Sequence, residues 1–283
     1  MKKIFLLTSV FLAVLTSTSC QKTSNWLIVK EVGPKVWQIS DNGDDNMYLI
    51  EGRDSSMLID TGLGVADLAS LVKKLSSKPL IVLNTHAHPD HSGANYQFEV
   101  IWLHPGDTAD ARAYDVPRQR PVSANAPQMS GPAENELYKG KIHKPKFKAV
   151  RDGQIFNLGG RRIEVIHAPG HSAGELCLLD KENKLLFTGD NTNALVWLWL
   201  PTCRPLSEYL KTLEKLAARS SEYTTIFPGH KDPLPADFIN DQIACVKGIL
   251  DGSLERKPYQ SGRGSALSSV YSRATVVFNP DNL

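Results

Sequence analysis

The segment Leu80-Ile-Val-Leu-Asn-Thr-His-Ala-His-Pro-Asp-His-Ser-Gly93 decides how the rest of this 283-residue chain is interpreted. It begins with four consecutive apolar residues, which is typical of a strand buried on both faces. Three histidines and one aspartate follow within six residues, at His86, His88, Asp90 and His91. A lone histidine would favour a surface position, but this grouping after a buried strand indicates a metal-binding loop.

The spacing of these four residues predicts two groups of ligands. On an extended strand, His86 and His88 point the same way. Pro89 ends the extended stretch, so a turn can carry Asp90 and His91 to the other side of a cavity. One metal ion would receive two imidazoles, and a second would receive a carboxylate and an imidazole. Zinc accepts this mixture of nitrogen and oxygen ligands.

Two metal ions need more ligands than one loop offers. Three further residues each follow a strand and a glycine, and the glycine permits a tight turn. They are His171 in Pro-Gly-His, Asp190 in Thr-Gly-Asp and His230 in Pro-Gly-His. Loops at strand ends bring ligands from distant chain positions onto a rigid scaffold. Each signal is weak alone, but together and in this order they indicate a dinuclear site.

With these motifs, the chain resembles the metallo-β-lactamase superfamily over roughly residues 26–280. Leu58-Ile-Asp-Thr-Gly62 also matches the first motif of that family. The resemblance implies an α+β fold, an αββα four-layer sandwich of two mixed β-sheets flanked by helices, with the metal site along one edge. It assigns His86, His88 and His171 to the first metal, Asp90, His91 and His230 to the second, and Asp190 to a bridge between them. It also implies that Asp60 orients the metal loop from behind the ligands.

The bridging position separates branches of that family. Zinc β-lactamases generally lack an aspartate there, whereas this chain has Asp190. The ligand set is more similar to that of hydroxyacylglutathione hydrolases, lactonases and phosphodiesterases. The resemblance therefore implies a hydrolase in which a metal-bridging hydroxide cleaves an ester, thioester or lactone. Three alternatives stay open: β-lactam hydrolysis, phosphodiester hydrolysis, and a non-catalytic metal-binding protein of the same fold.

The expected cofactors are two divalent metal ions, with zinc first and iron or manganese as alternatives. Asp90 is the candidate catalytic residue: it either orients the attacking water and carries its proton, or serves only as a ligand. The substrate is expected to be a small molecule. Trp197 and Trp199, in the apolar run after Asp190, either line an apolar pocket beside the metals or belong to a packing segment or dimer contact.

The N-terminus has the layout of an export signal. Lys2 and Lys3 precede an apolar run over residues 4–15, and small polar residues lead to Cys20. We expect residues 1–19 to be a signal peptide of the lipoprotein type, residues 20–25 a tether, and residues 26–283 the hydrolase domain. The protein is then exported to the bacterial periplasm or held at the cell envelope through a lipid on Cys20. An ordinary cleaved signal is the alternative.

Charge and cysteine content argue against a nucleic-acid-binding protein and against a structural zinc knuckle. The net charge is +2, and it falls to zero without residues 1–19, which carry two lysines and no acid. A neutral chain has no general attraction to nucleic acid. Cys177, Cys203 and Cys245 share no CxxC spacing, so a structural zinc knuckle is not expected. Pairing of Cys203 with Cys245 is left open, and the sequence indicates no oligomeric state.

Apolar periodicity predicts the elements around these motifs. Residues 115–150, rich in Pro, Ser, Asn and Lys, are expected to form a long insertion. Helices are expected at 64–75, 205–219 and 236–250. Strands are expected at 26–30, 35–40, 47–51, 56–60, 80–83, 99–103, 154–158, 162–166, 175–179, 184–187, 224–227 and 272–278.

Overall fold

The computed structural model describes residues 26–113 and 136–283. The expected signal peptide and tether, and residues 115–135 of the expected insertion, lie outside the described residues. The last residues of that insertion form β7 (Lys146–Ala149), which pairs in parallel with β6 (Val100–Leu103). Across the described part of the chain, no helix has the length and apolar character needed to cross a membrane.

The first sheet contains seven strands in chain order. Its first four strands are antiparallel neighbours, and the last three run parallel to β4. Besides β6 and β7 they are β1 (Leu27–Gly33), β2 (Val36–Asp41), β3 (Asp45–Glu51), β4 (Ser56–Ile59) and β5 (Leu80–Leu83). The helix α1 (Leu68–Leu75) covers the outer face with Leu68, Leu71 and Val72, which lie at helical spacing.

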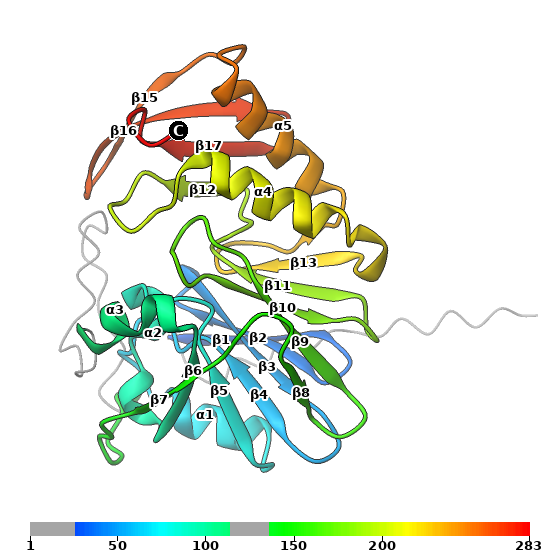
Figure 1. Ribbon diagram of the computed structural model, residues 1–283. Helices are drawn as coiled ribbons and strands as arrows, with labels where there is room; N and C mark the ends of the chain where they lie inside the picture. The colour runs from blue at the N-terminus through cyan, green and yellow to red at the C-terminus, as the bar shows by residue number, and fades with distance from the viewer. Residues whose placement is uncertain (1–25, 114–135) are drawn as a thin grey trace, which may run out of the picture.

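The second sheet has the strand order β14-β13-β11-β10-β9-β8. Its strands are β8 (Ile155–Asn157), β9 (Arg162–His167), β10 (Leu176–Asp180), β11 (Leu185–Gly189), β13 (Thr225–Pro228) and β14 (Leu234–Pro235). Two amphipathic helices, α4 (Leu206–Ala217) and α5 (Phe238–Leu250), cover its outer face (Figure 1). The short elements are α2 (Pro89–Ser92), α3 (Thr108–Ala113), η1 (Asn95–Gln97), η2 (Pro105–Asp107) and η4 (Ser220–Glu222).

Side chains that alternate between the two faces of a strand connect the layers of the sandwich. In β3, Tyr48 and Ile50 face the second sheet, whereas Met47 and Leu49 face α1. Strand side chains alternate between faces with a period of two, so one strand supplies both cores. The predicted αββα sandwich is confirmed. The expectation that β5 is buried along its whole length is only partly right, because Leu80 at its start is 36% exposed.

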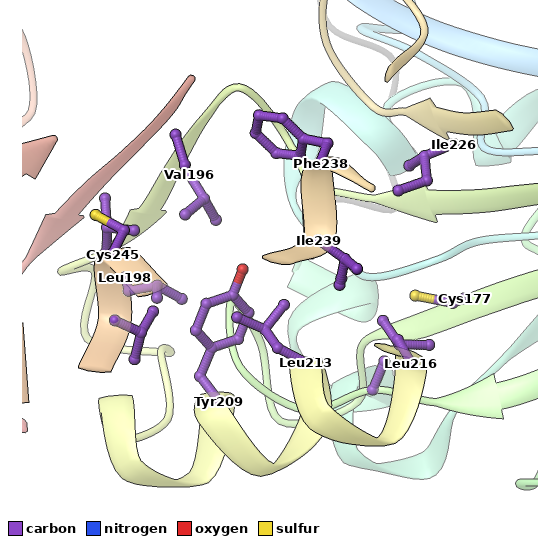
Figure 2. Packing of buried hydrophobic residues seen from close by; sticks show 14 of the residues in the cluster. Cys177, Val196, Leu198, Tyr209, Leu213, Leu216, Ile226, Phe238, Ile239 and Cys245 are labelled. Atoms are coloured by element: carbon purple, nitrogen blue, oxygen red, sulfur yellow. The ribbon is translucent and has the colours of Figure 1, made fainter. Parts of the chain in front are cut away.

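A third sheet, which the sequence did not indicate, covers α4 and α5 from the other side. It comprises β12 (Leu195–Leu198), β17 (Ala274–Phe278), β16 (Gly264–Tyr271) and β15 (Lys257–Ser261), in that order. Val196 and Leu198 point into the core around Tyr209 (Figure 2). Only β17 was expected as a strand. The strands β15 and β16 contain several serines and lack a clear apolar alternation, so their conformation depends on pairing: β16 pairs with β17, and β15 pairs with β16.

Candidate metal centre

The loop after β5 carries the first four candidate ligands. The strand ends at Leu83, the chain bends at Thr85 and His86, and His88, which is extended, caps α2. Pro89 occupies the first helical position, where its missing N–H costs no hydrogen bond. The single turn of α2 then reverses the chain at Asp90 and His91, as the sequence predicts.

The other three candidate ligands come from the second sheet. His171 follows β9, Asp190 directly follows β11, and His230 lies two residues beyond β13. Close approach of these loops depends on Gly229. A Cβ atom there would lie 2.5 Å from Asp190 Oδ1 and 2.7 Å from His91 Cε1, so a larger residue would displace both side chains.

All seven predicted residues meet at the edge where the two sheets face each other. Their donor atoms form three overlapping groups, each with all atoms within 4.8 Å of one another. The groups are His86 with His88 and His171, His86 with His91 and Asp190, and Asp90 with His91 and His230. The structure thus brings together both triads that the resemblance implies.

Asp190 lies between the two triads. Its Oδ2 atom is 3.5 Å from His171 Nε2 and 3.2 Å from His230 Nε2. Its Oδ1 atom is 3.4 Å from His91 Nε2. One carboxylate therefore faces a donor of the first triad and two of the second, which is the geometry that a bridging ligand needs.

The far nitrogen of three imidazoles has a fixed partner. His91 Nδ1 lies 3.0 Å from Asp60 Oδ2, where the resemblance places the orienting aspartate. His171 Nδ1 is 2.6 Å from the carbonyl oxygen of Trp197, and His230 Nδ1 is 2.8 Å from that of Asp44. Because carbonyls and carboxylates only accept, each Nδ1 carries a proton, and Nε2 is the nitrogen that faces the site and can bind a metal ion.

The donor atoms fit a pair of metal ions. His86 Nε2, His91 Nε2 and Asp90 Oδ1 are buried and have no hydrogen-bond partner among the described residues. His88 Nδ1 faces His171 Nε2 at 2.7 Å, although the proton of His171 is held on its other nitrogen. Unpaired buried polar atoms are costly. A cation in contact with these lone pairs removes that cost.

Burial and neighbouring charges determine the protonation of the side chains in the two triads. Burial lowers the pKa of His86 well below its usual value, and it lowers the pKa of His88 to about 3. Burial also acts to lower the pKa of His91. The negative charges of Asp190 and Asp60 outweigh this effect and raise the pKa of His91 to about 10. Burial alone would raise the pKa of Asp190, yet facing imidazoles hold it well below its usual range. The first triad thus favours the neutral imidazoles that bind metals.

Two residues beside the ligands were missed in the sequence. Glu175 is fully buried; its Oε1 atom accepts from the Asp190 backbone N–H at 3.1 Å and lies 3.7 Å from His86 Nδ1. Asn193 donates to Asp190 Oδ1 at 3.0 Å and accepts from the His230 N–H at 3.2 Å. The only sign of these two residues in the sequence is that each is an acid or amide within four residues of a candidate ligand.

The remaining histidines and the cysteines lie outside the ligand groups. His104 and His167 stack on each other with ring centroids 4.1 Å apart, and His143 faces Glu99. In the described part of the chain, the three cysteines are buried and free, so Cys203 and Cys245 are not paired.

The tryptophan segment after Asp190 forms β12. Its Val196 and Leu198 side chains pack in the core, while Trp197 and Trp199 are half-buried and in ring contact. The Trp197 side chain donates to Tyr259 Oη at 3.1 Å, and its carbonyl holds His171. The segment therefore packs in the core through alternate residues and touches the ligand set through its backbone.

Comparisons with known proteins agree with this geometry. The family model of the metallo-beta-lactamase superfamily matches residues 41–230. The acyl-coenzyme A thioesterase MBLAC2 of Bos taurus is 30% identical over 235 residues, covering 75% of this chain and 84% of that protein. The Homo sapiens protein of the same name is 28% identical over the same shares.

Solved structures share the fold at low sequence identity. The metallo-beta-lactamase from Pontibacter korlensis has a TM-score of 0.58 and 18% identity, covering 78% of this chain and 99% of that one. The sec-alkylsulfatase Pisa1 from a Pseudomonas species has a TM-score of 0.60 and 18% identity, covering 80% and 42%. Because the family model spans all seven residues at the site, this chain belongs to the metallo-beta-lactamase superfamily.

Proposed function

We propose that this protein is a dinuclear metal hydrolase that cleaves acyl thioesters, with acyl-coenzyme A as the substrate class and zinc as the metal. The observation that carries the proposal is the pair of donor triads that share Asp190. The substrate class is supported by the acyl-coenzyme A thioesterases, which are 26–30% identical to this chain over 72–75% of its length.

The bound ions would supply a nucleophile from water near neutral pH and polarise the thioester carbonyl. His86, His88 and His171 would hold one ion, and Asp90, His91 and His230 the other. The Asp60 carboxylate and the Asp44 carbonyl keep His91 and His230 in the required tautomer. The reaction adds water across the C–S bond and releases a carboxylic acid and a thiol, whose pKa of about 8.5 makes its thiolate a ready leaving group.

Asp90 is the residue placed to handle the proton. Its Oδ2 atom lies 3.8 Å from His230 Nε2, while its buried Oδ1 atom has no hydrogen-bond partner among the described residues. Because a carboxylate has two oxygens, one can bind the second ion while the other accepts the proton of the attacking water.

A hydrolysis panel on wild type, His88→Ala and His143→Ala tests the function. The panel contains an acyl-coenzyme A, a lactone, a β-lactam and a phosphodiester, and metal content is measured by mass spectrometry on the same samples. We expect thioester hydrolysis with two metal equivalents in wild type and in His143→Ala, whose histidine lies outside the ligand groups. His88→Ala should lose metal and more than about 100-fold of kcat/KM.

The outcomes separate the alternatives. Hydrolysis of the β-lactam or the phosphodiester in preference to the thioester would replace the substrate class. Metal binding with no turnover on any substrate would favour a non-catalytic protein. Activity that survives His88→Ala unchanged would mean that the site is misassigned.

We also propose export with a lipid anchor on Cys20. The support is the charged, apolar and small-residue sequence that ends at this cysteine. Expression of wild type and Cys20→Ala in a bacterial host tests it. The wild type should fractionate with membranes and carry the mass of a lipid, whereas the variant should not. Equal fractionation without a lipid mass would favour an ordinary cleaved signal.

A further inference from the structure

We propose that Asp107, which is not a ligand, is a positioning residue that fastens two ligand-bearing loops to each other. Asp107 ends η2, beyond β6, and is 2% exposed. The inference rests on the proposed metal centre but not on the proposed substrate.

The Asp107 carboxylate binds the loop that carries His171. Ser172 Oγ donates to Asp107 Oδ2 at 2.6 Å, and the Gly174 N–H donates to Oδ1 at 2.6 Å. These donors lie one and three residues beyond His171. Hydrogen bonds to an ionised carboxylate are shorter and about twice as strong as neutral ones. The carboxylate therefore fixes the loop immediately beside the ligand.

The same carboxylate faces the loop that carries His86 and His88. Burial raises the pKa of Asp107, and the backbone N–H of Ala87, the residue between these two histidines, is among the groups that counter this rise. Asp107, which follows a strand of the first sheet, thus accepts from the His171 loop of the second sheet and faces the other loop of the first triad.

Two further contacts bring the Asp107 segment close to the loop that follows His171. A Cβ atom at Gly174 would lie 2.6 Å from Asp107 Oδ1, so only glycine allows this approach. His104, three residues before Asp107, stacks on His167 with ring planes 12° apart. His167 Nε2 in turn lies 3.0 Å from the carbonyl oxygen of Ala173, in the same loop.

The consequence is a preset separation within the first triad. His88 Nδ1 and His171 Nε2 lie 2.7 Å apart although they belong to different sheets. Residues that hold ligands in place tune metal affinity by about 10–100-fold. Loss of the Asp107 carboxylate should therefore weaken metal binding without removing a ligand.

The test is a titration of metal-depleted protein with Co²⁺, followed by its visible absorption. The variants are Asp107→Asn, Ser172→Ala, which removes one of the donors, and Asp110→Asn, an exposed aspartate on α3 that serves as control. In Asp107→Asn, the charge is lost and the Ser172 hydroxyl must turn from donor to acceptor to pair with the amide N–H. We expect a 10–100-fold weaker Co²⁺ affinity and an altered spectrum, a smaller change in the same direction for Ser172→Ala, and wild-type behaviour for Asp110→Asn.

The melting temperature of each metal-free protein is measured in parallel. Wild-type affinity and spectrum in both Asp107→Asn and Ser172→Ala would overturn the positioning role, as would changes of equal size in Asp110→Asn. If Asp107→Asn does not fold, Ser172→Ala decides alone. Failure of the wild type to bind Co²⁺ would instead disprove the metal centre, and the positioning role with it.

Discussion

At the scale of single residues, the site depends on imidazoles in which one nitrogen is hydrogen-bonded to the protein and the other faces the site. The Nδ1 atoms of His91, His171 and His230 are occupied by oxygen acceptors, so their Nε2 atoms remain free to bind. The Asp190 carboxylate faces both triads. Its role as a bridge is therefore the most direct residue-level expectation.

The substitution Asp190→Asn should reduce the bound metal from two equivalents towards one. The amide keeps the shape of the side chain but removes the charge that holds both cations. We expect kcat/KM to fall by more than the roughly 100-fold that loss of a residue behind the ligands costs. Metal analysis at fixed free zinc, together with thioester kinetics, measures both effects. Two equivalents with unchanged kinetics would exclude a bridging role.

Asp41 should make the free energy of unfolding depend on pH. Burial raises its pKa to about 6, although the Leu63 N–H and the Trp26 indole both donate to the carboxylate. The folded pKa is above the usual aspartate value of 3.8, so the folded state binds the proton more tightly. The ionised carboxylate thus costs stability above pH 6, and this cost disappears as the pH falls towards 4. Two pKa units correspond to about 3 kcal/mol.

Urea unfolding of wild type and Asp41→Asn between pH 4 and pH 7, with a chelator present in both, checks this expectation. The unfolding free energy of wild type minus that of the variant should rise as the pH is lowered. A pH-independent difference would show that Asp41 titrates alike in the folded and unfolded chains.

At the scale of elements, α4 and α5 hold the second sheet from outside and also reach the site. The Tyr209 hydroxyl in α4 donates to the carbonyl oxygen of Asn191, the residue after Asp190, and lies in hydrogen-bond contact with Gln242 in α5. Its ring packs among Leu213, Ile239 and their neighbours (Figure 2). One side chain therefore joins two helices to a ligand loop.

The substitution Tyr209→Phe should lower the free energy of unfolding by about 1–3 kcal/mol, because it leaves buried polar groups without their partner. Tyr271→Phe is the matched control, since Tyr271 is 44% exposed. The control should change stability by no more than about 0.5 kcal/mol. Denaturant unfolding of both variants measures the effect, and equal losses would contradict the explanation.

At the scale of the whole molecule, the candidate metal centre joins two sheets. Loops of the first sheet supply His86, His88, Asp90 and His91, and loops of the second supply His171, Asp190 and His230. Each sheet has its own helical layer, and one apolar core lies between the sheets. Bound metal should therefore strengthen the contact between the halves.

Removal of both metal ions by a chelator should lower the melting temperature by about 15–30 °C. A ligand at 1,000 times its Kd stabilises a fold by about 4 kcal/mol per site, and each kcal/mol shifts the melting temperature by about 2–4 °C at this size. Calorimetry with and without chelator, and after zinc is restored, measures the shift. His88→Ala should respond less, and an equal response in that variant would argue against binding at this site.

The sequence by itself determined the candidate ligands and most of the elements around them. The His86–His91 motif is local, since four candidate ligands within six residues after an apolar strand are visible without any contact between distant segments. Apolar periodicity likewise predicted α1, α4, α5 and most strands of the sandwich, because the pattern directly reflects which face is buried.

Only the tertiary structure decided the rest. The third sheet depends on β12 pairing with β17, about 80 residues further along, and Ser-rich β15 and β16 carry no local signal for it. Asp107 and Glu175 acquire a role only when the loops of two sheets meet at one edge. Hydrogen bonds between residues so far apart in the chain leave no pattern in the sequence that corresponds to the periodicity of apolar residues. They depend on the packing of the two sheets, which brings their donors and acceptors together.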